Sequence, residues 1–295
     1  LKDGKLICML KLKSTNNMVT KTNMKTLRIL SLGAGVQSTV LALMIEKGEL
    51  PMVDCAIFAD TGAEPKAVYE HLDWLEKQLS YPVHRVQWRN LKEDILNASI
   101  GEYHGFTAPF YTMDSKGKKG ILMRQCTNDY KIKPVVQKIR QLMGYQKGER
   151  VDKKIWKVEQ LIGISTDEMQ RMKVNPHKYI ENQYPLIEKN MTRYHCLMWS
   201  KNNNYPQPPR SACTFCPFHS NKEWARVKEN KEEWEEVVTI DFAIRNTDQF
   251  KKNNKKNGLM YLHNSCVPIN EIDFNEDDGQ FAFDFKDECE GMCGN

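Results

Sequence analysis

Residues 27–39 read LRILSLGAGVQST, and this stretch decides the fold. Leu27 to Leu32 is a short apolar segment typical of a buried strand, and Gly33-Ala34-Gly35 predicts a tight turn. The next ten residues, 36–45, are apolar on nearly every face, which predicts a buried helix that ends near Gly48. A glycine turn that opens a helix directs backbone N–H groups at one point, and such a point suits a phosphate, although the turn could equally be a simple tight connection.

The same alternation of apolar strand and helix continues outward from this stretch. Because strands that alternate with helices form parallel sheets, the sequence predicts an α/β fold with a doubly wound parallel sheet. The expected strands are 53–58, 83–88 and 158–164, and the expected helices are 65–79 and 134–144.

The composition divides the chain into four parts. Residues 1–23 are a lysine-, threonine- and asparagine-rich string, predicted to be a disordered leader, and 24–190 hold the nucleotide-binding α/β domain. Residues 191–250 form a Cys-x-x-Cys and helical segment, with one charged helix from about 222 to 245 whose core face would carry Trp224, Trp234 and Phe242. Residues 251–295 are a polar, acidic tail.

Composition and charge exclude some classes of protein. With 40% hydrophobic and 27% charged residues, the chain is neither fibrous nor disordered over most of its length. No run approaches the roughly 18 apolar residues of a membrane span, so a cytoplasmic protein without a membrane partner is expected. The net charge is +5 although residues 271–290 hold nine Asp or Glu and one Lys. The rest of the chain is therefore basic, which suits nucleotide phosphates, a nucleic acid or simply a lysine-rich surface.

The nine cysteines indicate metal or thiol chemistry, since a chain with no export signal is not expected to use them as disulfides. Cys213-Thr214-Phe215-Cys216-Pro217 is the most specific local signal, because two intervening residues let both thiolates face one ion. Such a site needs two further ligands. We expect Cys126 and Cys196, with Cys289 and Cys293 as a rival pair and free buried thiols as the alternative without metal.

Four segments resemble, in order, motifs of the PP-loop ATP pyrophosphatases and the phosphoadenosine phosphosulfate (PAPS) reductases. Residues 33–39 resemble the pyrophosphate loop S-G-G-x-D-S/T, with Gly-Ala-Gly for Ser-Gly-Gly and Gln37 for the Asp. Residues 58–62, FADTG, resemble the second-strand motif that ends in Asp-Thr-Gly. Residues 124–127, followed by Lys131 and Pro134, resemble the cysteine-containing stretch, and 163–171 resemble the Gly-Ile/Leu-Arg-x-Glu-Gln-x-x-x-Arg strand exit, with Ser165 for its first arginine. With the later Cys-x-x-Cys, the resemblance spans about residues 27–218.

The resemblance implies a bound adenine nucleotide, either ATP, PAPS or adenylyl-sulfate. The residues expected to hold it are Ser31, Gly33, Ala34, Gly35, Gln37, Ser38, Thr39, Asp60, Thr61, Gly62 and Gly163. Arg171 could bind an anion through its planar guanidinium group, and Lys131, or alternatively Lys133, could add a positive charge. Cys126, Cys196, Cys213 and Cys216 would hold a four-iron four-sulfur cluster, with zinc as the alternative. For Asp60 the structural alternative is a cap of the turn before Pro65, and for Arg171 it is a pair with an acidic residue of its own helix.

The resemblance favours a PAPS reductase-like enzyme of sulfur metabolism. Residues 286–294 resemble the Glu-Cys-Gly tail of the sulfonucleotide reductases, so Cys289 and Cys293 would attack the sulfate sulfur and resolve the product, with a thiol reductant as partner. The alternative is a solvated acidic tail or a metal-binding pair of cysteines. The rival enzyme is an ATP-dependent sulfurtransferase that adenylates tRNA or DNA before thiolation. A third hypothesis is a module that binds nucleotide or nucleic acid without catalysis, which the Gln37 substitution would permit.

Overall fold

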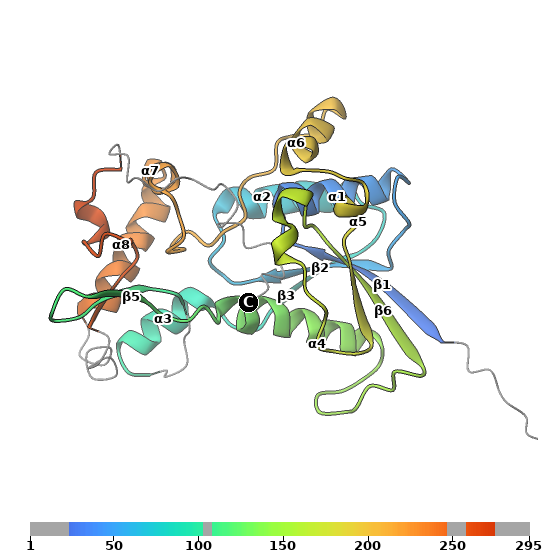
Figure 1. Ribbon diagram of the computed structural model, residues 1–295, viewed down its shortest axis with the longest axis horizontal. Helices are drawn as coiled ribbons and strands as arrows, with labels where there is room; N and C mark the ends of the chain where they lie inside the picture. Colours follow the sequence, from blue (N-terminus) through green and yellow to red (C-terminus); the bar gives the residue numbers. More distant parts are fainter. Residues whose placement is uncertain (1–23, 103–107, 247–257, 275–295) are drawn as a thin grey trace, which may run out of the picture.

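The computed structural model describes residues 24–102, 108–246 and 258–274, and its centre is a five-stranded sheet (Figure 1). All strands of this sheet are parallel, in the order β3-β2-β1-β6-β7. This confirms the predicted α/β fold with a parallel sheet. The strands are β1 (Lys25–Leu32), β2 (Cys55–Asp60), β3 (Val83–Gln87), β6 (Trp156–Ile162) and β7 (Ile180–Gln183).

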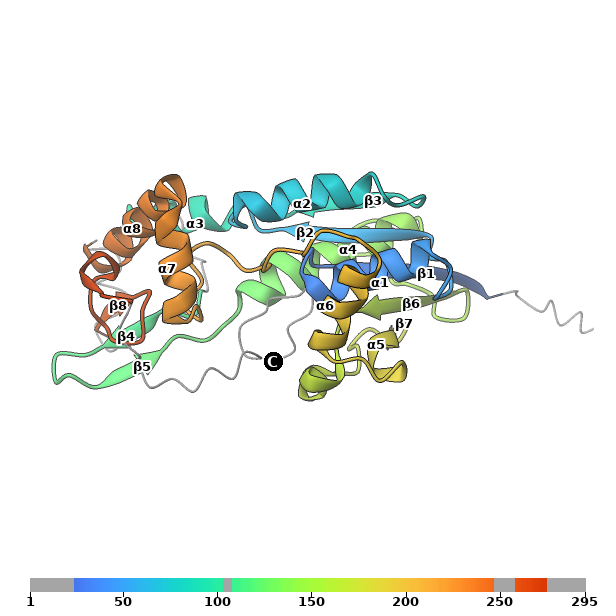
Figure 2. The same cartoon turned by 90° about the horizontal axis from the view of Figure 1, so that it is seen from above.

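Helices cover both faces of the sheet (Figures 1 and 2). On one face, α1 (Val36–Glu46) and α2 (Lys66–Glu76) pack on alternate strand residues such as Leu30. On the other face, α4 (Lys133–Leu142) packs on residues such as Ile29. Because successive strand residues point to opposite faces, the continuous apolar run of β1 supplies both cores.

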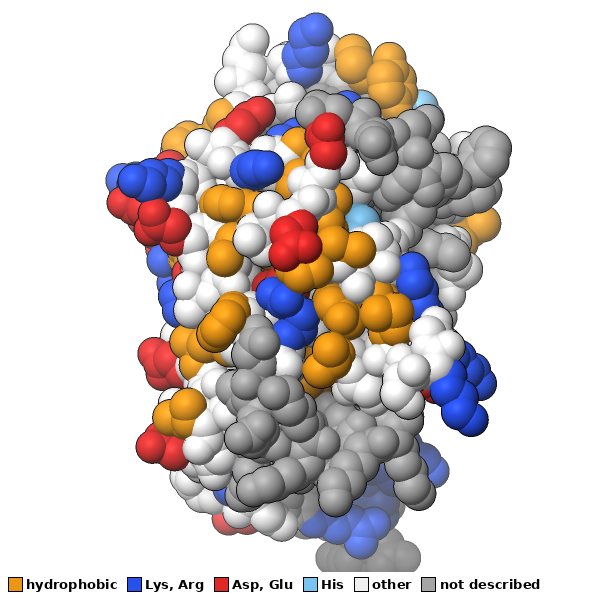
Figure 3. Space-filling model, turned by 90° about the vertical axis from the view of Figure 1, so that its left-hand side faces the viewer, with side chains coloured by type: hydrophobic (Ala, Val, Ile, Leu, Met, Phe, Trp, Pro, Cys, Tyr) orange, Lys and Arg blue, Asp and Glu red, His pale blue; other side chains and the backbone are white. Residues whose placement is uncertain are grey.

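A second region adjoins the sheet and has its own apolar cluster around Trp224. It contains α3 (Leu91–Ser99), α7 (Asn221–Glu229) and α8 (Lys231–Asn246). A small antiparallel sheet, in the order β5-β4-β8, joins them. Its strands are β4 (Tyr111–Met113), β5 (Lys119–Ile121) and β8 (Leu259–Tyr261). Apolar and charged side chains are interspersed on the outer face of this end of the molecule (Figure 3).

The structure corrects the single charged helix expected over residues 222–245. The chain leaves the helical conformation at Asn230 (φ −92°, ψ 106°), whose side chain accepts a hydrogen bond from the Glu233 amide, so α7 and α8 are separate helices. Trp224 is fully buried and Trp234 packs on the same cluster, as predicted. Phe242 is 62% exposed, so its place on the core face was predicted wrongly.

Short elements complete the description. They are a π-helix η1 (Thr127–Ile132), the 3₁₀ helices η2 (Thr166–Arg171) and η3 (Ile269–Glu271), and the helices α5 (Pro185–Glu188) and α6 (Arg193–Asn202). Within the described ranges, every helix is too short or too polar to cross a lipid bilayer.

Candidate functional site

Three adjacent strands end at the same edge of the sheet. Residue pairs Leu32–Phe58 and Ser31–Ile162 lie in register in the parallel ladders of β1 with β2 and with β6. The turns that follow are therefore neighbours: the glycine turn after β1, Thr61-Gly62 after β2 and Gly163 after β6. Ligands of doubly wound folds bind at this carboxyl edge.

The glycine turn presents the amino terminus of α1. Gly35 is its N-cap residue in extended conformation, and no side chain of the described residues caps the first turn. Ala34 adopts a positive φ of 57°, a conformation that L-residues rarely take. Gly163 packs so closely on the turn that a Cβ there would lie 2.8 Å from the Ser38 amide nitrogen. The backbone N–H groups of this turn and the helix dipole can attract an anion.

The side chains of the glycine turn hold the turn in place. Gln37, Ser38 and Thr39 are buried. The Gln37 amide donates to Glu168 Oε2 (3.2 Å) and accepts from Arg193 (3.3 Å). The Ser38 hydroxyl accepts from the Gly33 amide (3.2 Å), and Thr39 Oγ1 bonds His71 Nε2 (3.1 Å). These contacts leave the backbone, rather than the hydroxyls, as the feature of this turn that suits a ligand.

Asp60 caps its own turn, which is the role that the sequence offered as the alternative to contact with a nucleotide. Its Oδ1 accepts from the Gly62 amide and from the Tyr69 hydroxyl, both at 2.7 Å. Burial, followed by the hydrogen bond to Asp60, raises the pKa of Tyr69. The neighbouring Thr61 Oγ1 lies 3.4 Å from Cys213 Sγ, which links the β2 turn to the Cys-x-x-Cys segment.

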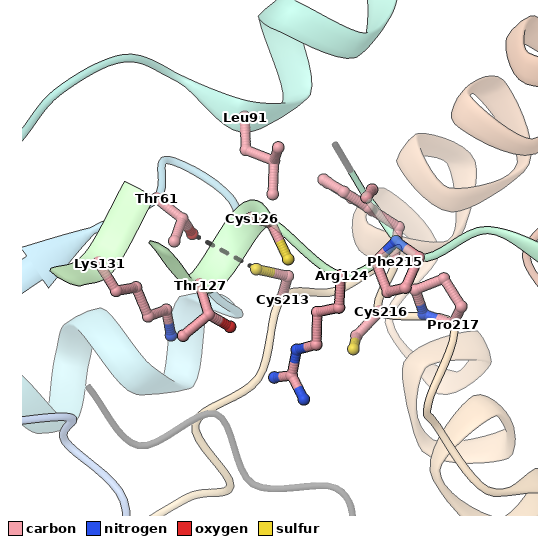
Figure 4. A pocket seen from close by; sticks show the side chains of 12 residues that line it. Thr61, Leu91, Arg124, Cys126, Thr127, Lys131, Cys213, Phe215, Cys216 and Pro217 are labelled. Atoms are coloured by element: carbon pink, nitrogen blue, oxygen red, sulfur yellow. Dashed lines mark hydrogen bonds between the residues drawn. The ribbon is translucent and has the colours of Figure 1, made fainter. Parts of the chain in front are cut away.

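Three of the four expected metal ligands line one small pocket (Figure 4). Cys126, Cys213 and Cys216 surround a cavity of about 30 Å³ together with Arg124 and Lys131. That volume holds about one water molecule. Burial, followed by the charge of Glu64, raises the pKa of the Cys213 thiol well above its usual value, against the opposite effect of Lys131.

Lys131 forms a buried ion pair. Its Nζ lies 3.0 Å from Glu64 Oε1, and both side chains are almost inaccessible to solvent. The Ser211 hydroxyl also donates to Glu64, at 3.4 Å. The pair stands between the β2 turn and the cysteine pocket, so the expected anion-binding charge of Lys131 is already matched by a carboxylate.

Cys196 does not join the other cysteines. It lies on α6, fully buried in the apolar cluster beneath α1, whereas Cys126 and Cys213 pack on the cluster around Trp224. Among the residues that the structure describes, no three His, Cys, Asp or Glu side chains are placed to share a metal ion. The site expected from Cys126, Cys196, Cys213 and Cys216 is therefore not formed in this structure, and the described residues by themselves do not fit a four-iron cluster. Cys289 and Cys293 lie outside the described residues.

Arg171 forms an ion pair with Glu168 of its own short helix, which the sequence offered as the alternative to binding an anion. Its Nη1 lies 2.6 Å from Glu168 Oε1, and Glu168 in turn bonds Gln37. Arg171 also lines a second pocket of about 230 Å³, which shares Thr127 with the cysteine pocket.

Sequence reasoning missed four charged residues at this edge: Glu64, Arg124, Lys173 and Arg193. Glu64 directly follows the predicted Asp-Thr-Gly motif, and Arg124 opens the cysteine-containing stretch, so proximity to motifs could have found both. Arg193 contacts Gln37 across 156 residues, and its role has no local signal.

Comparisons with known proteins give a limited result. No protein-family model and no curated protein sequence matches the chain. Among solved structures, it is similar to the crystal structure of a PAPS reductase from Candida auris in a phosphate complex. The similarity has 15% sequence identity and a TM-score of 0.38, and it covers 62% of this chain and 74% of that one. A likeness of this extent is no basis for assigning an activity.

Proposed function

We propose that the chain is an adenine-nucleotide enzyme of sulfur chemistry that holds nucleotide phosphates at the amino terminus of α1. The observation that carries the proposal is the convergence of three strand exits on that terminus. Gly163 leaves room for the Ser38 amide, and the first turn of α1 has no side-chain cap. Uncapped N–H groups and the helix dipole together favour a bound anion.

The cysteine pocket supports sulfur chemistry at the same edge. Thr61, in the turn after β2, contacts Cys213, so thiols lie beside the proposed nucleotide site. A metal ion or cluster on Cys126, Cys213 and Cys216 rests on the sequence resemblance alone, because no three His, Cys, Asp or Glu side chains of the described residues are placed to share a metal ion. Iron and zinc analysis after anaerobic purification tests it.

In the reductase form of this proposal, the thiolate of Cys289 or Cys293 attacks the sulfur of an adenylyl-sulfate. The S–O bond to the nucleotide breaks, and an adenosine phosphate leaves. The other thiolate then attacks the first cysteine sulfur, which releases sulfite and forms a disulfide. An external thiol reductant restores both cysteines. Sulfite release from PAPS or adenylyl-sulfate is therefore the activity to measure.

A pair of variants at Gly35 tests the nucleotide site. Gly35 has φ −90° and ψ −174°, which any residue can adopt, and Asp or Asn at an N-cap favours the helix. G35D places a carboxylate where the phosphate would bind, whereas G35N is close in shape and neutral. We expect G35D to lower the affinity for ATP and PAPS by at least about tenfold relative to G35N, by calorimetry. Equal affinities in two folded variants would remove α1 from the site.

A basic pocket favours the second candidate, an ATP-dependent sulfurtransferase that acts on a nucleic acid. Its walls include Arg150, Lys153, Lys154 and Lys178, around a volume of about 610 Å³. These residues precede β6 and β7, at the edge of the sheet opposite the glycine turn. Clustered cations of this kind bind phosphate backbones. Cleavage of ATP to AMP and pyrophosphate with tRNA or DNA present, without sulfite release, would favour this candidate.

A further inference from the structure

Lys173 lines the 230 Å³ pocket, and its ammonium group is buried without a partner among the residues that the structure describes. Lys173 Nζ is inaccessible to solvent and has no hydrogen-bond partner among the described residues. A buried ammonium group without an acceptor is costly, and native proteins normally supply a carboxylate, a carbonyl or a bound ligand. The missing partner of Lys173 is therefore the first sign of a ligand.

The backbone around Lys173 is held rigidly. The Lys173 amide donates to the Tyr184 hydroxyl (3.0 Å), which donates in turn to the Lys173 carbonyl (2.8 Å). Asn182 donates to the same carbonyl at 2.9 Å, and Asn175 donates to Asn182 at 3.1 Å. These contacts involve the main chain of Lys173, so they fix the origin of its side chain without using its charge.

The charge lining this pocket is positive. Arg171 and Lys173 line it, and no residue that the structure describes in its wall is acidic. The nearby Glu168 carboxylate is already paired with Arg171. Neutral donors on the wall, such as Thr127 and Asn128, suit the oxygens of an anion.

The position of the pocket ties it to the carboxyl edge of the sheet. Ile162 and Ile164, which flank Gly163 in the chain, form part of its wall. Gly163 itself lies against the glycine turn. The pocket volume of about 230 Å³ is below the roughly 300–1,000 Å³ of pockets that enclose whole ligands. It suits one tetrahedral oxyanion and a part of the molecule to which that oxyanion is attached.

We propose that this pocket, the Lys173 pocket, binds a phosphate-monoester or sulfate oxyanion, and that the Lys173 side chain turns its buried Nζ toward the bound oxyanion. The oxyanion can come from two sources. It can be free phosphate or sulfate, or it can be a second phosphate on the nucleotide, in which case the inference rests on the function proposed above.

The test uses three variants of the full chain. K173M removes the ammonium and keeps the main-chain contacts, K173R retains a cation, and K189M removes an exposed lysine outside the pocket as the matched control. Thermal unfolding first shows which variants are folded. Calorimetry then measures inorganic phosphate, 5′-AMP and adenosine 3′,5′-bisphosphate on each protein.

We expect inorganic phosphate to bind the wild type and K189M alike, and to bind K173M at least about tenfold more weakly. K173R should keep much of the affinity. If the nucleotide is the source, the wild type prefers the bisphosphate over 5′-AMP, and K173M loses this preference while its affinity for 5′-AMP is unchanged. If free oxyanion is the source, only the phosphate affinity depends on Lys173.

Other outcomes overturn one proposal and leave the other standing. Equal phosphate and bisphosphate affinity in wild type and folded K173M refutes the Lys173 pocket, as does a wild type that binds neither. Should K173M fail to fold, loss of phosphate binding in K189M or in folded K173R would contradict the assignment. Phosphate binding that depends on Lys173, in a protein that binds no adenine nucleotide, keeps the pocket and refutes the proposed function.

Discussion

Gly163 lies against the backbone of Ser38, with 2.8 Å between the position of a Cβ on Gly163 and the Ser38 amide nitrogen. Real Cβ atoms do not approach a backbone nitrogen so closely, so any side chain here must displace the first turn of α1. The exit of β6 and the glycine turn after β1 therefore fit together only with glycine at this position.

The first prediction follows from that fit. G163A should destabilise the protein by about 1–3 kcal/mol through overpacking and should weaken nucleotide binding by moving the α1 amides. Urea unfolding measures the first effect and calorimetry with ATP or PAPS the second. A variant with wild-type stability would show that the two turns are not in close contact.

Ala34 provides the second prediction. Its φ of 57° costs an L-residue about 1–2 kcal/mol, whereas glycine adopts it freely but loses more chain entropy on folding. We expect A34G to be neutral or to stabilise by up to about 1 kcal/mol, and A34V to destabilise strongly because β-branched residues tolerate positive φ least. Urea unfolding of both variants checks the order; a more stable A34V would contradict it.

Because His71 is buried, we expect it to make the free energy of unfolding depend on pH in the acid range. Burial lowers the pKa of His71 to about 4, and its Nε2 lies 3.1 Å from Thr39 Oγ1. Between pH 6.5 and 4 the unfolded chain binds a proton here that the native state does not, so stability falls as the pH falls. The loss amounts to at most about 3 kcal/mol.

Unfolding measured at pH 7 and pH 5 tests this. H71Q should show a smaller difference between the two pH values than the wild type. His219, whose pKa burial lowers to about 3, keeps its own contribution in both proteins. An unchanged difference in H71Q would show that His71 titrates normally.

We expect the effects of substitutions at Glu64 and Lys131 on the free energy of unfolding to be strongly non-additive. K131M leaves a buried carboxylate without its cation and should cost about 3–5 kcal/mol. The double variant E64Q/K131M removes both charges and should be more stable than K131M alone. Equilibrium unfolding of the single and double variants measures the coupling, and additive effects would mean that the two charges do not interact.

The sheet and its principal helices could be predicted because their signals are local and repeated. β1 and α1 are apolar on both faces, and Asp60-Thr61-Gly62 marks the end of β2 from sequence alone. The break at Asn230 could not be predicted in this way. The residues on both sides of it are good helix formers, and a single asparagine cap gives a weak signal.

The arrangement of the cysteines could likewise be predicted only where a local sequence pattern indicates it. Spacing brings Cys213 and Cys216 together, and the sequence resemblance adds Cys126, but the position of Cys196 depends on which face of α6 packs on α1. Likewise, Arg171 and Lys173 are only two residues apart. The pair of Arg171 with Glu168 is local and could be predicted from the sequence. The Lys173 ammonium group has no partner among the described residues although its main chain contacts Tyr184, and no local pattern indicates this.

The packing of α6 on α1 determines where the chain can be cut. Cys196 is fully buried in the cluster that Leu41 and Leu43 of α1 also form. A fragment that stopped at residue 190 would leave this side of α1 open to water, directly behind the glycine turn. We therefore expect the part that contains β1 and α1 to fold in one cooperative event with the segment that follows it, and limited proteolysis between residues 190 and 203 should unfold both together.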